Sequence, residues 1–160
     1  MENISTHISY KESTRTDTHL PNIPDDQQVV NMIVTANRVF EPVREYFNKP
    51  IAISSFFRSK EVNKKIGGAK NSQHLLGKAI DMDAQVLGGL GNKDIFEYIY
   101  KYLDYDQLIG EDLDDFGEPN WIHVSYNSPN NRFQTLVMVK HKNKSLYFPY
   151  KNSLIKSDYL

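Results

Sequence analysis

Residues 72–81 read Ser72-Gln73-His74-Leu75-Leu76-Gly77-Lys78-Ala79-Ile80-Asp81. A histidine and an aspartate stand seven residues apart in this stretch, and the aspartate lies in an alternating, strand-like run. Residues 121–125 read Trp121-Ile122-His123-Val124-Ser125, a second strand-like run with another histidine at its centre. Because side chains alternate across a strand, each run directs its polar side chains to one face and its aliphatic side chains to the other. The pattern predicts a polar site above a hydrophobic core.

The side chains of His74, Asp81 and His123 are of the types that bind zinc in proteins. Two imidazoles and one carboxylate leave a fourth coordination position for water, which distinguishes a catalytic zinc site from a closed structural one. The chain has no cysteine, so a thiolate zinc site is excluded. The ordinary alternative is that the histidines form hydrogen bonds in the core and that Asp81 caps a backbone N–H or forms an ion pair. We favour the zinc site of a hydrolase.

Length and composition fit one globular domain. The 160 residues are 39% hydrophobic and 24% charged, and the formal net charge is -1. This balance gives no electrostatic argument for a nucleic-acid partner or for binding to an anionic membrane. No apolar run reaches membrane-spanning length, so we expect no membrane insertion. The polar N-terminus, MENISTHISYKEST, is unlike a secretory signal, so we expect synthesis in the cytoplasm.

The periodicity of the hydrophobic residues predicts an α+β domain with an antiparallel sheet and flanking helices. Helices are expected over 26–47, 59–67 and 92–103. Pro42 is expected to kink or divide the first, and Ser59 is expected to cap the second. Strands are expected over 51–54, 78–84, 105–110 and 121–126, and a hairpin over 133–150. We predict an irregular N-terminal segment (1–24), one domain (25–150) and a C-terminal tail (151–160).

The motif Ser-x-His-x6-Asp, followed by Trp-x-His-x-Ser, resembles the M15 family of zinc D,D-peptidases. Upstream, Ser55-Phe56-Phe57-Arg58-Ser59 resembles the family's Ser-x-x-Arg-Ser segment, and Val62-Asn63 and Gly67-Gly68-Ala69 resemble the approach to the first histidine. The resemblance covers residues 51–126. The family includes bacterial D-Ala-D-Ala carboxypeptidases and dipeptidases and phage L-alanyl-D-glutamate endolysins. It shares its zinc fold with the hedgehog signalling domain, so the resemblance implies a hedgehog/DD-peptidase-like fold.

The resemblance implies a Zn2+-dependent peptidase whose partner is the stem peptide of peptidoglycan. A small chain without a signal fits a phage-type endolysin, which would reach the cell wall by another route. The alternatives are a D-Ala-D-Ala carboxypeptidase or dipeptidase and a non-catalytic zinc-fold binding module. The resemblance implies that Arg58 binds substrate and assists catalysis, because its guanidinium offers a planar fork of donors. The other expected substrate-binding residues are Ser72, Gln73, Trp121 and Ser125.

The resemblance offers two positions for a general base. Many M15 enzymes place an acidic residue three positions before the last zinc histidine, where this chain has Asn120, and an amide cannot accept a proton. In the hedgehog branch a glutamate ends the preceding strand, and Glu111 occupies the similar position here. We therefore predict Glu111 as the base, with Glu118, Asp83 or no base as the alternatives. The acidic stretch 111–118 is otherwise expected to be a solvated loop.

Overall fold

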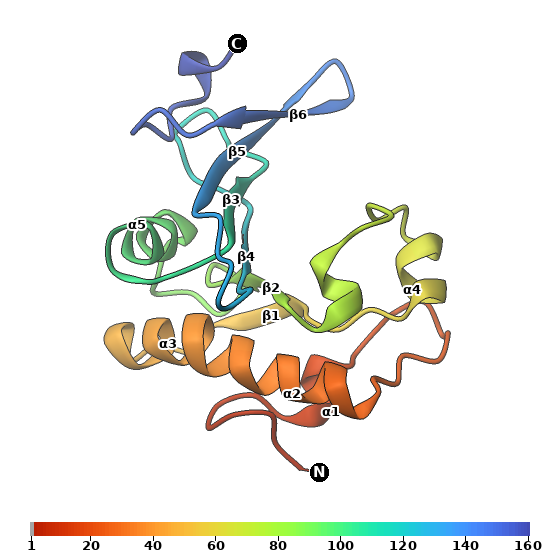
Figure 1. Cartoon of the computed structure of the whole chain (residues 1–160). Coiled ribbons are helices and arrows are strands. Elements are labelled where there is room, and N and C mark those ends of the chain that lie inside the picture. Colours follow the sequence, from red (N-terminus) through yellow and green to blue (C-terminus); the bar gives the residue numbers. More distant parts are fainter. Residues whose placement is uncertain (1) are drawn as a thin grey trace.

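A six-stranded sheet forms the centre of the computed structural model, which describes residues 2–160 (Figure 1). The strand order along the sheet is β1-β2-β4-β3-β5-β6. The strands are β1 (Ala52–Ser55), β2 (Ala79–Asp83), β3 (Gln107–Glu111), β4 (Trp121–Ser125), β5 (Gln134–His141) and β6 (Lys144–Pro149). The α+β class and the largely antiparallel sheet are confirmed.

One pair of strands departs from the antiparallel expectation. β5 runs parallel to β3, although it is antiparallel to its hairpin partner β6. The chain reverses direction after β4 and then adds β5 to the far edge of β3. β3 runs antiparallel to β4. β5 also runs opposite to β4, so it is parallel to its neighbour β3. Sequence patterning specifies strands but not this crossover.

The long N-terminal helical run has a change of pitch in the middle. α2 (Asp26–Thr35) starts at a capping box between Asp25 and Gln28 and leads into a π-helical turn, Ala36–Phe40. α3 (Glu41–Phe47) follows, with Pro42 in its first turn. Proline has no N–H to donate, so the wider turn before it accommodates the interrupted hydrogen bonding without ending the helical run. The expected division at Pro42 is therefore a local change in pitch.

Two further helices were expected, and a 3-10 turn that the sequence did not predict lies between them. α4 (Lys60–Lys65) begins after Ser59, whose Oγ accepts the N–H of Val62, as its sequence predicted. η2 (Gln73–Leu76) is a single 3-10 turn before β2. α5 (Asn92–Tyr102) packs its apolar side against β3 and β4. None of the helices within residues 2–160 is long and apolar enough to span a membrane.

The two faces of the sheet have opposite characters. One face is aliphatic and packs against the α2–α3 run and α5 (Figure 1). Its buried side chains are Ile80, Met82, Leu108, Ile122, Val124, Val137 and Val139. The register places Asp81, His123 and Glu111 on the other face, because directly paired residues point the same way. The core therefore supports a polar surface on the reverse side of the same strands.

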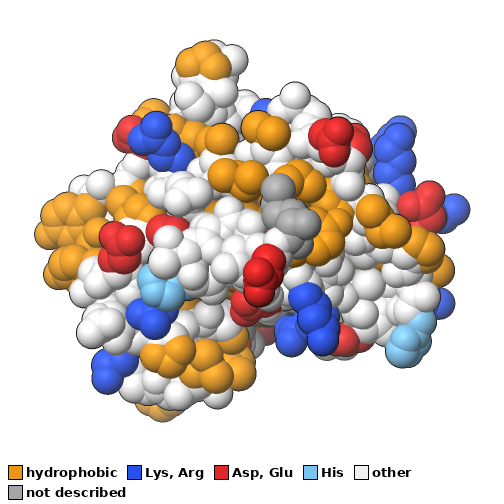
Figure 2. All heavy atoms as spheres, turned by 90° about the horizontal axis from the view of Figure 1, so that it is seen from below, with side chains coloured by type: hydrophobic (Ala, Val, Ile, Leu, Met, Phe, Trp, Pro, Cys, Tyr) orange, Lys and Arg blue, Asp and Glu red, His pale blue; other side chains and the backbone are white. Residues whose placement is uncertain are grey.

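The segments at both ends pack on the domain. Residues 2–24, expected to be irregular, contain a helical turn, α1 (Tyr10–Ser13), and bury Ile4 and Ile8. Near the C-terminus, η3 (Lys156–Asp158) lies between the buried side chains of Leu154 and Tyr159. Seen from the side of α1 and α2, the surface mixes hydrophobic, acidic and basic side chains with no dominant charge (Figure 2). This mixture agrees with the formal net charge of -1.

Candidate metal centre

A tight turn brings His74 to the sheet. The Oγ of Ser72 accepts the N–H of His74, and Gly77 ends η2 in the left-handed conformation with φ of 68°. A Cβ on Gly77 would lie 2.6 Å from the backbone oxygen of Gln28 in α2, so only glycine fits this contact. The close approach lets η2 pack on α2, and the chain then enters β2, which carries Asp81.

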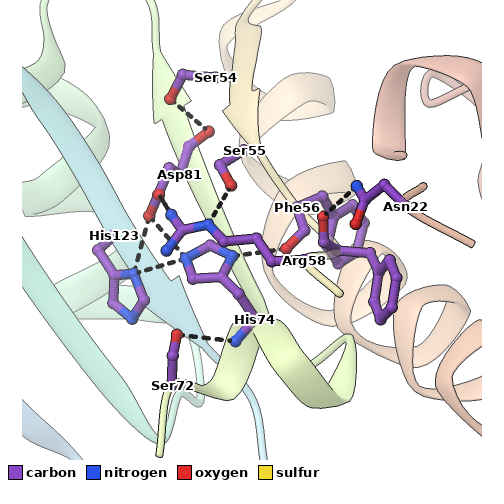
Figure 3. A network of polar contacts seen from close by, with 10 residues as sticks. Asn22, Ser54, Ser55, Phe56, Arg58, Ser72, His74, Asp81 and His123 are labelled. Carbon is purple, nitrogen blue, oxygen red and sulfur yellow. Dashed lines mark hydrogen bonds and ion pairs between the residues drawn. The ribbon is translucent and has the colours of Figure 1, made fainter. Parts of the chain in front are cut away.

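Strand pairing brings Asp81 and His123 together. Asp81 of β2 is directly opposite His123 of β4, so their side chains share one face. Figure 3 shows His74 approaching this pair from its turn, with all three side chains converging. The sequence predicted these three residues as a set, and the structure places one ligand atom of each within 4.8 Å of the others.

The spacing of the three ligand atoms fits a zinc ion. His74 Nε2 lies 3.2 Å from Asp81 Oδ1 and 3.3 Å from His123 Nδ1, and the last two atoms are 2.8 Å apart. In a tetrahedral site with bonds of about 2.0–2.1 Å, neighbouring ligand atoms are separated by about 3.3 Å. The triangle therefore has nearly the size that a tetrahedral ion requires.

The protonation of His74 also suits metal binding. Its Nδ1 lies 2.6 Å from the carbonyl oxygen of Phe56, and a carbonyl can only accept, so Nδ1 carries the proton. Burial lowers the pKa of His74 despite the nearby negative charge of Asp81, which favours the neutral ring. A neutral ring with a proton on Nδ1 leaves the lone pair of Nε2 free. This backbone contact orients His74 in the way that metal-binding histidines commonly require.

Asp81 divides its two oxygens between different partners. Oδ1 faces the two histidines, whereas Oδ2 accepts a hydrogen bond of 2.7 Å from Nη2 of Arg58. The Nε of Arg58 donates to Ser55 Oγ at 2.8 Å, which fixes the guanidinium in the site (Figure 3). Burial would raise the pKa of Asp81, but its interactions with the two histidines hold that pKa well below its usual range. Asp81 is therefore ionised, as a candidate metal ligand should be.

Glu111 ends β3 on the same face as the three candidate ligands. It pairs with Trp121, and the next residue on that face of β3, Ile109, pairs with His123. The Glu111 side chain is buried, and its Oε2 has no hydrogen-bond partner within residues 2–160. Burial raises the pKa of Glu111 to about 7, and the negative charge of Asp81 adds to the rise while His123 opposes it. A carboxylate with this pKa is suited to accept a proton near neutral pH.

The two alternative bases and Asn120 lie elsewhere. Glu118 accepts from the Gln85 side chain and the backbone N–H of Lys93, and the Oδ1 of Asp83 accepts from Asn92. None of these acidic groups lines the cavity that contains the candidate ligands. Asn120 is exposed and donates to Asp112. Of the acidic residues considered from the sequence as a base, only Glu111 lines that cavity.

Two cavities meet at the candidate metal centre. The larger, about 730 Å³, contains the three candidate ligands and Glu111, and the smaller, about 320 Å³, lies against the N-terminal segment 15–18. Arg58, Ile66, Asp81 and Trp121 line both. Ser72 and Gln73, which were predicted to bind substrate, line the larger cavity.

Ser125 is the exception among the residues expected to bind substrate. It lies on the same face as His123, but it is completely buried and its Oγ accepts the backbone N–H of Gln107. A buried side chain cannot contact substrate, so the expectation for Ser125 is corrected. Its hydroxyl stabilises the pairing of β3 with β4.

The C-terminal hairpin supplies residues that the sequence did not indicate. Leu136, Met138 and Lys140 of β5 and Ser145 and Tyr147 of β6 form one wall of the larger cavity. The hairpin itself was expected from the alternation in residues 133–150, but alternation alone does not tell which face meets the site. That choice depends on the parallel pairing of β5 with β3.

Comparison with known proteins gives one family match. A family model described as Peptidase M15 matches residues 6–125. The match includes His74, Asp81, His123, Arg58 and Glu111, whereas β5 and β6 lie beyond it. No curated protein matches the chain.

Proposed function

The chain belongs to the M15 peptidase family, and from that membership we propose that it is a zinc-dependent enzyme that hydrolyses a peptide bond in the stem peptides of peptidoglycan. The observation that carries the zinc assignment is the triangle of ligand atoms from His74, Asp81 and His123. Its spacing fits one tetrahedral ion, and the Phe56 carbonyl leaves the inward nitrogen of His74 unprotonated. The resemblance to phage endolysins supports an endolysin role within this proposal.

The residues of the site divide the catalytic work. Bound zinc supplies Lewis-acid chemistry, which makes water a stronger nucleophile at neutral pH and polarises a carbonyl. Glu111 accepts the proton of the attacking water and passes it to the leaving amine, for which its pKa of about 7 is suited. Arg58 keeps Asp81 in place and offers its remaining N–H groups to the oxygen that gains negative charge.

The arrangement of the cavities supports cleavage within a peptide. Space extends to both sides of Asp81, because the cavity near residues 15–18 and the larger cavity share Arg58 and Trp121. A carboxypeptidase needs room for only one residue beyond the scissile bond, whereas an endopeptidase binds substrate on both sides. We therefore place endopeptidase action ahead of D-Ala-D-Ala carboxypeptidase action.

The test is digestion of purified peptidoglycan and of soluble stem peptides, with the products identified by mass spectrometry. We expect zinc-dependent release of stem-peptide fragments, and loss of that release with a chelator. Glu111→Gln should lower the rate by about a hundredfold or more, since general-base catalysis contributes about 10²–10⁴. Glu118→Gln is the matched control and should retain the parental rate. If the parental protein cleaves no wall peptide with zinc present, the peptidoglycan assignment is wrong and the non-catalytic module becomes the better account.

A further inference from the structure

The β5–β6 hairpin forms one wall of the larger cavity at the candidate metal centre, referred to below as the cleft. In the β5–β6 hairpin, Tyr147 pairs with Met138, so both side chains point to the same face of the sheet. Leu136, two residues earlier on that face of β5, pairs with Ile109 of β3. Tyr147 therefore lies on the same face as Glu111 and lines the same cavity. This wall lies beyond residues 6–125, so the family match does not describe it.

The Glu111 side chain is buried and lines the cleft. Its Oε2 is buried without a hydrogen bond among the described residues, and a buried acceptor without a partner is unfavourable. The cations of the cleft are already paired elsewhere: Arg58 with Asp81, Lys140 with Asp112, and Arg132 with Asp106. The phenol of Tyr147 lines the same cavity and is an uncharged hydrogen-bond donor.

The charges around these two groups keep the phenol protonated. Tyr147 is half-exposed, and its partial burial raises its pKa, as do the negative charges of Glu111 and Asp81. The charged or titratable groups that affect Glu111 are His123 from β4, Asp81 from β2, Asp112 at the end of its own strand and Tyr147 from β6. Tyr147 and His123 favour the ionised form of Glu111, whereas the two aspartates oppose it. Tyr147 is thus a neutral donor on the same face and in the same cavity as the Glu111 carboxylate.

We propose that Tyr147 is a positioning residue that donates a hydrogen bond to the Glu111 carboxylate and orients it toward the reacting water. The inference rests on the proposed function, because it assigns Glu111 the role of base. The hydrogen bond favours the ionised carboxylate, which is the form that can accept a proton. It also restricts rotation of a carboxylate whose Oε2 has no hydrogen-bond partner among the described residues. The C-terminal hairpin then contributes to catalysis as well as to the shape of the cleft.

The test compares the parental protein with Tyr147→Phe, which removes only the hydroxyl. Tyr102→Phe on α5 is the matched control, because Tyr102 is 69% exposed and lies outside the cleft. We expect Tyr147→Phe to lower kcat about tenfold or more, with KM within about twofold, because a hydrogen bond to a charged group contributes about 1.5–3 kcal/mol. The acid limb of the rate profile should move to higher pH. Tyr102→Phe should match the parental protein in all three respects.

A second measurement separates this inference from the proposed function. Carbon-13 NMR titration of glutamate-labelled, metal-free protein reports the pKa of Glu111 directly. We expect this pKa to rise in Tyr147→Phe and to stay unchanged in Tyr102→Phe. An unchanged Glu111 pKa overturns the hydrogen bond, and a rise in KM with kcat unchanged overturns the positioning role in favour of substrate binding. If the parental protein cleaves no wall peptide, the proposed function fails, and the titration alone decides whether the two side chains are bonded.

Discussion

Replacing Glu111 by glutamine is expected to stabilise the metal-free protein at neutral pH, although the same change removes the proposed base. The reason is the burial of a carboxylate without a hydrogen-bond partner for Oε2. Burial raises the pKa of Glu111 from an ordinary 4.5 to about 7. Glutamine has nearly the same shape, and it does not ionise. The substitution therefore removes the unfavourable ionisation with little change in packing.

The pH window follows from the direction of the shift. Below about pH 4.5 the carboxyl is protonated in both the folded and the unfolded chain, so it adds no penalty. Between 4.5 and about 7 the unfolded chain ionises while the folded protein keeps the proton, so stability falls as pH rises. Above about pH 7 the carboxyl is ionised in both states, and the full free-energy cost of ionising it in the folded protein lowers stability. At about 1.4 kcal/mol per pKa unit it is on the order of 3 kcal/mol.

The assay is urea unfolding of metal-free parental protein and Glu111→Gln at pH 5 and pH 8. A difference of this size moves the urea midpoint by on the order of 1 M, because m-values are about 1–3 kcal/mol/M. The gain should be clear at pH 8 and small at pH 5. Glu45→Gln on the exposed surface of α3 is the control and should give no pH-dependent gain. Equal midpoints of parental protein and Glu111→Gln at pH 8 would refute the argument from burial.

The remaining predictions concern the metal and Arg58. Zinc at about a hundredfold excess over its dissociation constant should stabilise the native state by about 2.7 kcal/mol, which raises Tm by about 5–10 °C. The double variant His74→Ala, His123→Ala should lose both this increment and the bound metal, and zinc retained in metal analysis would sink the ligand assignment. Arg58→Ala should lower the rate on muropeptides about ten- to hundredfold with the fold intact by circular dichroism. Parental kinetics or a collapsed fold would limit Arg58 to its structural pairing with Asp81.

Positions close together in sequence, or within one element, were predictable because their geometry is local. The alternation around Asp81 and around His123 fixed which neighbours face the core, and the structure keeps that alternation. The Ser59 cap depends on a hydrogen bond spanning three residues, so the sequence located the start of α4. The N-terminal helical run was likewise expected, although the strain near Pro42 spread into a π-helical turn that periodicity does not reveal.

Which side chains of distant segments lie close together could be known only from the tertiary structure. Alternation placed Ser125 beside His123, but the structure buries Ser125, and its hydroxyl accepts a backbone hydrogen bond from β3. The choice of Glu111 over Glu118 and Asp83 as the acidic group in the cavity depends on the register of β3 against β4.

The sequence by itself determined the three candidate ligands and the strands that carry two of them, because residue type and alternation are local properties. Only the tertiary structure decided that the C-terminal hairpin closes the cleft and brings Tyr147 to the same face as Glu111. The physical reason is that β5 joins the sheet beside β3 through a crossover. Long-range backbone hydrogen bonds select that edge, and no pattern within residues 133–150 specifies them.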